Sequence, residues 1–504
     1  MNHTNIFSYI YDAIERNPST IALSDGENSM TYSELFQKIL IIENNLMQKT
    51  NIRYRDIVII YSSRNSSYIT MMLSLVKLGI TYVPLEKNTP INLMRKLAKD
   101  IGAKYVITDQ EICVQEIPVI LFSSLESTPK FEDHKKICYE PDLTDAIYII
   151  STSGSSGDPK GVIIEHHNLI NLLCSLKKYI YNGIVHKHPC RIAVMASFSF
   201  DSSVKQIFMA LCNGNTLIIC PTHIKKLGRL TIDFLRRNSV DVLDVTPSLI
   251  ESFSMDHKAQ SYDKLSLLLC GGEILREKHI LQARKLFSDE INIVNLYGPT
   301  ECCVDVAYHI IPPAFRAENP DKILPIGVPI DNVSFCIDKE CDGELVIEGE
   351  CVGRGYTGSY KNSFETDSNG LKRYRTGDVC DVDSDGLYYI TGRIDNQVKF
   401  RGYRVELDAI DNKIMQLPDT SVALSFCSNQ YRYSCIYTFV KTDFDIQSIR
   451  NYLERELPQY MIPTFIQKID GKIQINNNGK IDKSYYKRMM INHLETIRED
   501  EGKF

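Results

Sequence analysis

The sequence predicts a large α/β domain built on parallel sheets, with a β-rich subdomain, followed by a small α+β domain. β-branched runs at residues 56–62 and 104–108 flank a helical pattern at 70–78, the order that parallel strands joined by crossover helices require. The chain has 504 residues, more than one hydrophobic core usually supports, so at least two domains are expected. From residue 343 onwards strands become shorter and turns more frequent, which indicates the β-rich part.

The remaining elements of the first domain continue this alternation. Apolar side chains at helical spacing over residues 7–14, followed by Asn17-Pro18, predict a short amphipathic helix. Further strands are expected at residues 146–150, 191–196, 216–220, 240–245, 266–270 and 292–296. In the β-rich part, strands at 343–347 and 387–390 are expected, with a turn at 384–386.

The residues after Asp395 predict a separate, smaller domain. The expected elements are, in order, a helix at 405–417, strands at 422–427 and 434–440, and a helix at 446–457. This order fits an α+β domain of about a hundred residues. We therefore expect one domain of residues 1–394 and a second of residues 395–504.

Composition and charge exclude several classes of protein. Charged residues make up 24% of the chain, the net charge is −6 and no long basic run occurs, so we expect no nucleic acid partner. No apolar run approaches the roughly 18 residues of a membrane span, and no cationic leader begins at Met1. We therefore expect a cytoplasmic protein that does not bind membranes. The 15 cysteines lack zinc spacing, which predicts reduced thiols.

A loop rich in Gly, Ser and Thr follows the strand expected at 146–150. It could be a plain flexible turn, but its glycines allow positive φ, and its N–H groups and hydroxyls can surround an anion beside the positive Lys160. The spacing is not that of a Walker P-loop, because Asp158-Pro159 separate the glycine from the lysine. The loop predicts a nucleotide phosphate clamp made of Thr152, Ser153, Gly154, Ser155, Ser156, Gly157 and Lys160.

Further motifs place polar side chains on turns. Residues 295–301, Asn-Leu-Tyr-Gly-Pro-Thr-Glu, follow a strand at the edge where open α/β sheets bind ligands. Residues 374–378 end in Thr-Gly-Asp, residues 392–406 are densely charged, and residues 478–483 read Asn-Gly-Lys-Ile-Asp-Lys. Taken singly, they could be a packing aromatic, a turn, a linker and a solvated lysine.

Together these motifs resemble those of the adenylate-forming enzymes, which comprise acyl-CoA synthetases, luciferases and the adenylation domains of nonribosomal peptide synthetases. Matches at 30–35, 78–85 and 457–463 extend the resemblance to nearly the whole chain. It implies that the protein uses ATP and Mg²⁺ to activate a carboxylic acid. The departures at Asn477, Ile481 and Lys483, where the family usually has Pro, Val and Arg, leave this chemistry unaffected.

The resemblance implies a role for each matching residue. Besides the phosphate loop, the implied ATP-binding residues are Asn295 and Tyr297 on adenine, Gly298, Thr300 on phosphate, and Asp378 and Arg393 on the ribose. Glu301 would hold Mg²⁺, and Asp395 would be the hinge of a mobile C-terminal domain. Lys480 would bridge the substrate carboxylate and the α-phosphate, with Thr152, Lys160 and Glu301 as the other catalytic residues.

A carboxylate after the strand at 191–196 indicates the acyl group. Phe-Asp-Ser-Ser-Val at 200–204 resembles the motif of amino-acid-activating domains, in which the aspartate, here Asp201, binds the α-ammonium group; the alternative is a helix N-cap. By motif alignment with that family, the pocket positions are Asp201, Ser202, Lys205, Asp244, Leu269, Gly271, Leu296, Val304, Asp305 and Lys480. This set most resembles glutamate-activating pockets, with Lys205 pairing the side-chain carboxylate, and glutamine comes next. If the aspartates dominate, ornithine or lysine would fit.

The acceptor is expected to be a separate molecule. No Gly-Gly-x-Ser carrier segment follows Lys480, so we expect a separate phosphopantetheinylated carrier protein, as in stand-alone adenylation domains and D-alanine:carrier protein ligases. Coenzyme A is the alternative acceptor. Two other functions stay open at this point: a non-catalytic adenylate-binding scaffold, and an acyl-CoA synthetase for an acid that is not an amino acid.

Overall fold

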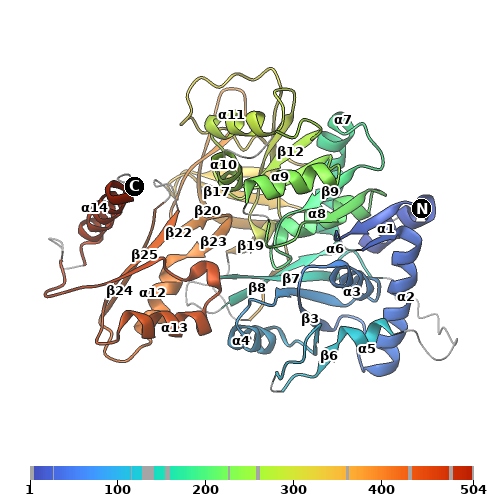
Figure 1. Ribbon diagram of the computed structural model, residues 1–504, viewed down its shortest axis with the longest axis horizontal. Helices are drawn as coiled ribbons and strands as arrows, with labels where there is room; N and C mark the ends of the chain where they lie inside the picture. The colour runs from blue at the N-terminus through green and yellow to red at the C-terminus, as the bar shows by residue number, and fades with distance from the viewer. Residues whose placement is uncertain are drawn as a thin grey trace. The chain divides into compact units, whose positions relative to one another are not determined.

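The fold is given by a computed structural model. It describes residues 5–26, 28–114, 116–127, 141–153, 159–224, 227–256, 261–358, 363–428, 434–475 and 481–501. Contacts divide the chain into two compact units (Figure 1). The first unit comprises Met1–Lys87, Ala98–Ser151 and Gly161–Ile394, and the second comprises Asn88–Leu97, Thr152–Lys160 and Asp395–Phe504.

A nine-stranded sheet forms the centre of the first unit. Its strands are, in spatial order, β15 (Val328–Pro329), β14 (Ala307–Ile311), β13 (Asn292–Tyr297), β12 (Leu267–Cys270), β11 (Val242–Val245), β9 (Arg191–Val194), β10 (Thr216–Ile219), β1 (Ile21–Ser24) and β2 (Ser29–Thr31). The strands from β13 to β1 are parallel, as predicted, but β14, β15 and β2 are antiparallel to their neighbours. The short segment between β13 and β14 has no crossover helix, so the chain can only return antiparallel.

A second sheet has seven strands. In spatial order they are β18 (Gly355–Tyr356), β8 (Pro159–Glu165), β7 (Ala146–Ser153), β4 (Thr81–Glu86), β3 (Ile57–Ser62), β5 (Tyr105–Thr108) and β6 (Val119–Leu121). The strands from β7 to β6 pair in parallel, as the βαβ alternation predicts. β7 leads into the Gly/Ser/Thr-rich loop, and β8 begins directly after it.

Helices cover these sheets. Their bounds are α1 (Ile6–Arg16), α2 (Tyr32–Lys49), α3 (Ser66–Lys77), α4 (Ile91–Ile101), α5 (Phe122–Glu126), α6 (His166–Leu176), α7 (Asn182–Ile184), α8 (Asp201–Leu211), α9 (Gly228–Arg237), α10 (Pro247–Met255) and α11 (Glu277–Leu286). Local signals fix several starts: Thr31 and Glu34 form a capping box at α2, and Thr246 caps α10. A π-helical turn, Lys177–Tyr181, joins α6 to α7.

Alternate residues of the central strands face two separate cores. Leu267 and Leu269 of β12 pack in one core with Phe208 of α8, whereas Leu268 packs in the other with Phe253 of α10. Figure 1 shows α9, α10 and α11 gathered on the second side. Because both faces are buried, the strands are continuously apolar, which explains why their sequences are easily recognised.

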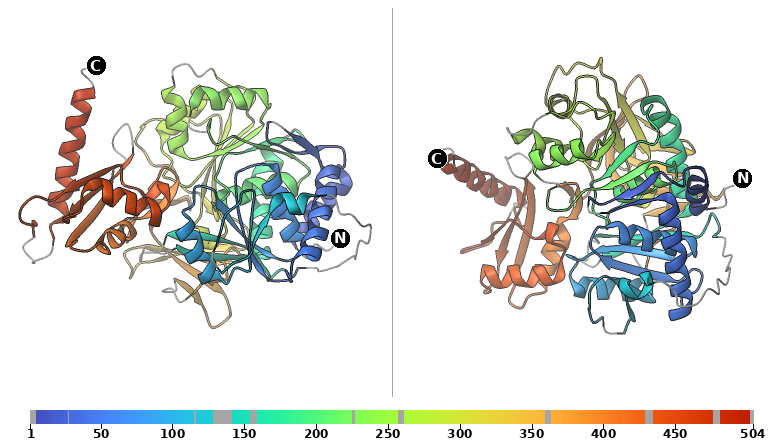
Figure 2. Two further views of the ribbon diagram at one scale, coloured as in Figure 1. Left: turned by 60° about the horizontal axis from the view of Figure 1, so that its bottom comes forward. Right: turned by 45° about the vertical axis from the view of Figure 1, so that its right-hand side comes forward.

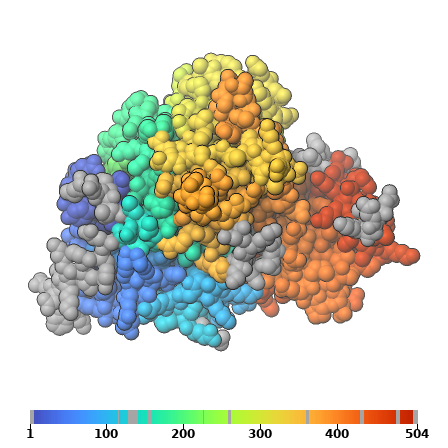
Figure 3. Space-filling view, turned by 180° about the vertical axis from the view of Figure 1, so that it is seen from behind, coloured from blue at the N-terminus to red at the C-terminus, as the bar shows by residue number. Residues whose placement is uncertain are grey.

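The β-rich part is an antiparallel sheet in the first unit. It comprises β16 (Val333–Asp338), β17 (Glu344–Gly349), β20 (Lys372–Val382), β19 (Phe364–Thr366) and β21 (Tyr388–Arg393). The chain segment that contains it, yellow to light orange, forms a continuous part of the surface in Figure 3. Asp378 on β20 lies opposite Arg393 on β21, so the register of this sheet brings two predicted site residues together.

The second unit contains a hairpin and a three-stranded sheet between helices. Its elements are β22 (Gln397–Phe400), β23 (Tyr403–Glu406), α12 (Leu407–Met415), β24 (Val422–Ser428), β25 (Cys435–Lys441), α13 (Ile446–Glu456), β26 (Phe465–Lys468) and α14 (Lys483–Glu501). Ala423 packs towards α12 and α13, whereas Val422 and Leu424 pack against α14 on the other face. Figure 2 shows α14 as the dark red helix at the C-terminus. The predicted helix at 405–417 begins only at Leu407, because Tyr403–Glu406 pairs with β22 across a tight turn.

The predicted fold class is therefore confirmed, and the predicted strands end within three residues of the observed ones. The hairpin β22–β23, the strand β1 with its neighbouring edge strand β2, and α14 were not predicted. The cysteines of the described residues carry free thiols. Among the helices of the described ranges, none is both long enough and apolar enough to cross a membrane.

Candidate active site

Asp201 lies at the start of α8. The N-cap of this helix is Phe200, so Asp201 is the first helical residue and the N-cap alternative is wrong. Its side chain is hydrogen-bonded to that of Thr300 in the 3₁₀ turn Thr300–Cys302. Burial raises the pKa of Asp201 to about 6, and the charge of Asp305 adds to this effect, which the bond with Thr300 opposes. The site thus holds a carboxylate beside the turn that follows β13.

One helical turn further along α8, Lys205 forms a buried cluster with two aspartates. Its Nζ lies 2.6 Å from Oδ2 of Asp305 and 2.8 Å from Oδ2 of Asp244. The three side chains, here called the Lys205 cluster, are 2–7% exposed. Burial by itself would lower the pKa of Lys205, but the charges of Asp244 and Asp305 raise it well above its usual range. Lys205 is therefore a permanent cation.

Three neighbouring strands supply the other pocket positions. Asp244 of β11 lies opposite Leu269 of β12. Gly271 follows β12, and a Cβ atom there would lie 3.2 Å from the Leu296 carbonyl oxygen and 3.8 Å from Oδ1 of Asp305. The predicted pocket positions of the first unit are therefore neighbours at the carboxyl ends of parallel strands, where open α/β sheets place ligands.

A strained turn places the last two pocket positions. Cys303 and Val304 both have positive φ angles, 59° and 75°. Such an angle is rare for a β-branched residue such as valine. The turn brings Val304 and Asp305 back against Gly298. A Cβ atom on Gly298 would lie 2.7 Å from Cα of Asp305 and would also meet the Val304 carbonyl oxygen. Glycine at position 298 is thus required for the close approach of residues 303–305, here called the pocket turn, to the end of β13.

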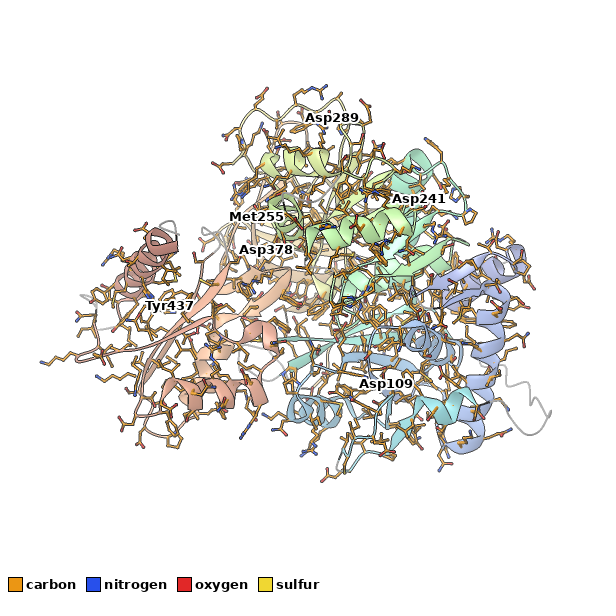
Figure 4. The ribbon with its side chains drawn as sticks, in the orientation of Figure 1. Asp109, Asp241, Met255, Asp289, Asp378 and Tyr437 are labelled. Carbon is orange, nitrogen blue, oxygen red and sulfur yellow. The ribbon has the colours of Figure 1, made fainter. Side chains whose placement is uncertain are left out.

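The predicted nucleotide residues form a second group in the first unit. The Tyr297 hydroxyl donates a hydrogen bond of 2.6 Å to Oδ2 of Asp378, whose other oxygen pairs with Arg393. Asn295 donates from Nδ2 to the carbonyl oxygen of Pro325 at 2.7 Å. Tyr297 is 4% exposed and packs in an apolar cluster. Its partner Asp378, which is labelled in Figure 4, is also buried. The tyrosine therefore has a packing role and also fixes the Asp378 carboxylate.

Glu301 is a fully buried carboxylate in the Thr300–Cys302 turn. The Tyr356 hydroxyl donates to its Oε1 at 2.7 Å, and its carbonyl oxygen accepts from the Gly353 amide at 2.9 Å. The sequence analysis did not identify Tyr356, because nothing local marks a tyrosine in the short strand β18. Only the pairing of β18 with β8 in the seven-stranded sheet brings it here.

Thr376 was also missed as a site residue. Its hydroxyl oxygen accepts from the Asp378 amide at 3.0 Å, and the hydroxyl donates to the Leu345 carbonyl at 2.8 Å. Its carbonyl oxygen accepts from Arg393 at 3.2 Å. Thr376 belongs to the Thr-Gly-Asp motif, so the sequence pattern already pointed to it. Only the contacts within the sheet show that it fixes the backbone next to Asp378.

The remaining predicted residues belong to the second unit or lie outside the described residues. In the second unit, Thr152 donates from Oγ1 to the Lys160 carbonyl oxygen at 3.5 Å. Asp395 opens the C-terminal segment of this unit, and its carboxylate accepts from the Gln397 amide at 3.1 Å. Ser153 lies at the end of β7. Residues outside the described ranges are Gly154, Ser155, Ser156, Gly157 and Lys480.

Comparison with known proteins shows the class to which this chain belongs. Residues 10–357 match the sequence profile of the AMP-binding enzymes, so the chain is a member of this family of adenylate-forming proteins. It is 31% identical over 487 residues to bacitracin synthase 1 of Bacillus licheniformis, covering 93% of this chain but only 9% of that protein. The chain thus corresponds to a small part of this relative.

Two solved structures share the fold. One is the Vibrio cholerae adenylation domain AlmE in complex with glycyl-adenosine-5′-phosphate, with a TM-score of 0.83, 20% identity and coverage of 98% of each chain. The other is an artificially fused adenylation–PCP di-domain from Klebsiella oxytoca, with a TM-score of 0.81 and 22% identity, covering 93% of this chain and 94% of that one. The resemblance and the fold class expected from the motifs are confirmed.

Replacing Gly298 should disturb the site. We expect Gly298→Ala to lower the midpoint of thermal unfolding by several degrees, because the added methyl group meets backbone atoms that cannot move aside without a loss on the order of 1–3 kcal/mol. Differential scanning fluorimetry measures this shift. Gly183→Ala is the matched control, because a Cβ atom there meets nothing within 4 Å. Equal midpoints for the two variants would contradict the close approach.

Proposed function

We propose that the protein is an amino-acid-activating ligase. The carboxylate of the amino acid attacks the α-phosphorus of ATP, which gives an aminoacyl-adenylate and releases pyrophosphate. A thiol then takes the aminoacyl group and AMP leaves. In such reactions the protein contributes mainly by holding the reactants in place and by stabilising the charge that develops on the phosphate.

One observation carries this proposal: Asp201 lies beside the Thr300–Cys302 turn of the nucleotide motif. An ammonium-binding carboxylate next to the nucleotide site suits a substrate with both an α-amino group and a carboxylate to be activated. An acid without an amino group would leave this partly buried carboxylate without a counter-charge, which is unfavourable. This argues against the alternative of an acyl-CoA synthetase for a different acid.

The two groups of buried residues have distinct proposed roles. Tyr297 and Asn295 bind adenine. Asp378 accepts hydrogen bonds from both ribose hydroxyls, and its bonds to Tyr297 and Arg393 orient its carboxylate. Thr300 and the phosphate loop, residues 152–157 with Lys160, bind the phosphates. The proposed catalytic lysine, Lys480, acts from the domain of residues 395–504, which turns about Asp395 between the two half-reactions.

Glu301 fits the Mg²⁺ ion that ATP chemistry requires. Mg²⁺ prefers oxygen ligands and is commonly held by one or two carboxylates together with substrate phosphates. Within the described parts of the chain, no three His, Cys, Asp or Glu side chains lie together as a complete metal site. Glu301 would therefore hold the ion jointly with phosphate oxygens, and the bound ion would neutralise phosphate charge.

The Lys205 cluster supports a polar side chain in the substrate. An ammonium group has three N–H donors, and the two aspartates engage two of them at most, so one donor can serve a substrate oxygen. The carboxylate of glutamate is our first proposal, and the amide of glutamine can use the same donor. Ornithine or lysine would instead bring a second ammonium group to the aspartates and compete with Lys205 for them.

We further propose that the acceptor is the phosphopantetheine thiol of a carrier protein on a separate chain. The proposal of a carrier is supported by the kinship with synthases and by the structural neighbour from Klebsiella oxytoca, in which an adenylation domain and a PCP are artificially fused. Incubation with ATP, the amino acid and a phosphopantetheinylated carrier should give a thioester that mass spectrometry detects.

ATP–pyrophosphate exchange with each amino acid tests the activation step. We expect exchange with glutamate, weaker exchange with glutamine and little with apolar amino acids, because the Lys205 cluster needs polar partners. Hydroxamate trapping of the adenylate gives an independent readout. Exchange with apolar amino acids only would reject the assignment of the side chain, and exchange with none would reject amino acid activation.

The binding of the amino acid should weaken in acid. Because the pKa of Asp201 is raised to about 6, the carboxylate is ionised above this pH and becomes protonated below it. A protonated Asp201 cannot pair with the α-ammonium group, so the KM for glutamine, whose side chain does not titrate, should rise by up to about tenfold per pH unit below pH 6. The KM for ATP serves as the internal control. A fall of the glutamine KM in acid would contradict this role of Asp201.

Replacement of the proposed catalytic lysine should stop activation. We expect Lys480→Ala to reduce the rate of adenylate formation by about a hundredfold or more, because a positive charge at the reacting phosphate is lost. The matched control is Lys472→Ala, which removes an exposed lysine of the same domain. Single-turnover formation of the adenylate is the measurement. An unchanged rate in Lys480→Ala would favour a non-catalytic scaffold.

A further inference from the structure

The charges around Lys205 do not balance. The pocket positions include three carboxylates, Asp201, Asp244 and Asp305, but the only cation among those described is Lys205. The α-ammonium group of an amino acid would compensate Asp201. One negative charge then remains on the Lys205 cluster before any substrate side chain arrives. A glutamate side chain would add a second one to the same buried ammonium group.

The two aspartates of the cluster are held differently. Lys205 donates a hydrogen bond of 2.6 Å to Oδ2 of Asp305. Oδ2 of Asp244 is close to the same Nζ, at 2.8 Å, but it is a buried oxygen that forms no well-oriented hydrogen bond within the described residues. The contact of Lys205 with Oδ2 of Asp244 is therefore less well oriented than its bond to Asp305, and a proton on this oxygen could be donated to an incoming oxygen.

The other titratable groups around Asp244 stay neutral near pH 7. Tyr181, which the π-helical turn places near both aspartates, has its pKa raised well above the usual range by burial. Burial likewise raises the pKa of Cys270, which lies near Asp244 and Lys205, and of Cys303, which lies near Asp305 and Asp201. These groups neither supply a compensating positive charge nor take up a proton. The carboxylates alone can adjust the charge of the site.

Given the proposed function, we propose that glutamate binds together with one proton, which is shared between its γ-carboxyl group and Asp244. The proton comes from solvent, and no covalent bond forms or breaks in the process. Lys205 then donates to the γ-carboxyl group, and the cluster keeps one net negative charge, as it has in the free protein.

The physical reason is the repulsion between carboxylates in a buried site. A third carboxylate beside a single ammonium group would have no counter-charge, and like charges in a buried site disfavour ionisation, so one of the carboxyl groups takes up a proton. Glutamine needs no proton, because its carbonyl oxygen accepts from Lys205 while its amide nitrogen donates to Asp244. The proposal therefore separates the two substrates by pH, although both use the same contacts.

The pH dependence has a definite sign. A ligand that binds with one proton binds more weakly as pH rises. The effect is about tenfold per pH unit, as long as neither the free protein nor the free ligand carries that proton. We expect the apparent dissociation constant of glutamate, measured by ATP–pyrophosphate exchange, to rise about tenfold from pH 7 to pH 8. Glutamine is the internal control, because its binding responds to every other titrating group of the site. Its apparent dissociation constant should not rise by this factor.

Two variants locate the proton. We expect Asp244→Asn to remove the pH dependence of glutamate binding, because an amide donates a hydrogen bond at every pH. Asp241→Asn is the matched control. It should retain the pH dependence of glutamate binding, because Asp241 pairs with Lys187 instead of Lys205. The wild-type titration decides the matter even if a variant fails to fold.

The outcomes distinguish this proposal from the proposed function. Exchange with glutamate that is independent of pH between 7 and 8 would overturn proton uptake and leave amino acid activation intact. A pH dependence that persists unchanged in Asp244→Asn would also overturn it. The absence of any exchange with glutamate would reject the substrate assignment itself, and the proposal with it.

Discussion

The site depends above all on the ion pairs that Lys205 makes with Asp244 and Asp305. These three side chains come from α8, from β11 and from the turn after β13, so one ammonium group ties together three elements that are far apart in sequence. Removing one partner would leave an uncompensated charge in the interior, which typically costs about 3–5 kcal/mol. The cluster thus fixes the geometry of the pocket and also decides which charges a ligand meets there.

A second constraint is that one short segment serves both halves of the site. From Asn295 to Asp305 the chain supplies the nucleotide motif, the buried Glu301 and the end of the pocket. To place all these residues within such a short segment, the chain adopts positive φ angles at Cys303 and Val304 and has no side chain at Gly298. The nucleotide motif and the last pocket positions thus lie on one continuous stretch of backbone.

The antiparallel β-rich sheet has a supporting function that its sequence does not reveal. It aligns Asp378 with Arg393, and Thr376 fixes the backbone between them. The carboxylate is thus oriented by groups from β13, β20 and β21 before any ligand is present. Such preorganisation is what a site needs in order to bind polar ligands without rearranging at each cycle.

The sequence by itself determined the fold class, the alternation of strands and helices and the positions of the motifs, because apolar periodicity, glycines and short polar motifs act locally. It also supplied, by resemblance, the proposed pocket positions, which stay a prediction; Lys205, Asp244 and Asp305 among them lie together in the structure. Only the tertiary structure showed that Lys205 is engaged by both aspartates, that Tyr356 bonds to Glu301 and that Tyr297 bonds to Asp378. These contacts join residues 39 to 100 positions apart. The pairing of strands and the packing of α8 decide them, and no local pattern encodes either.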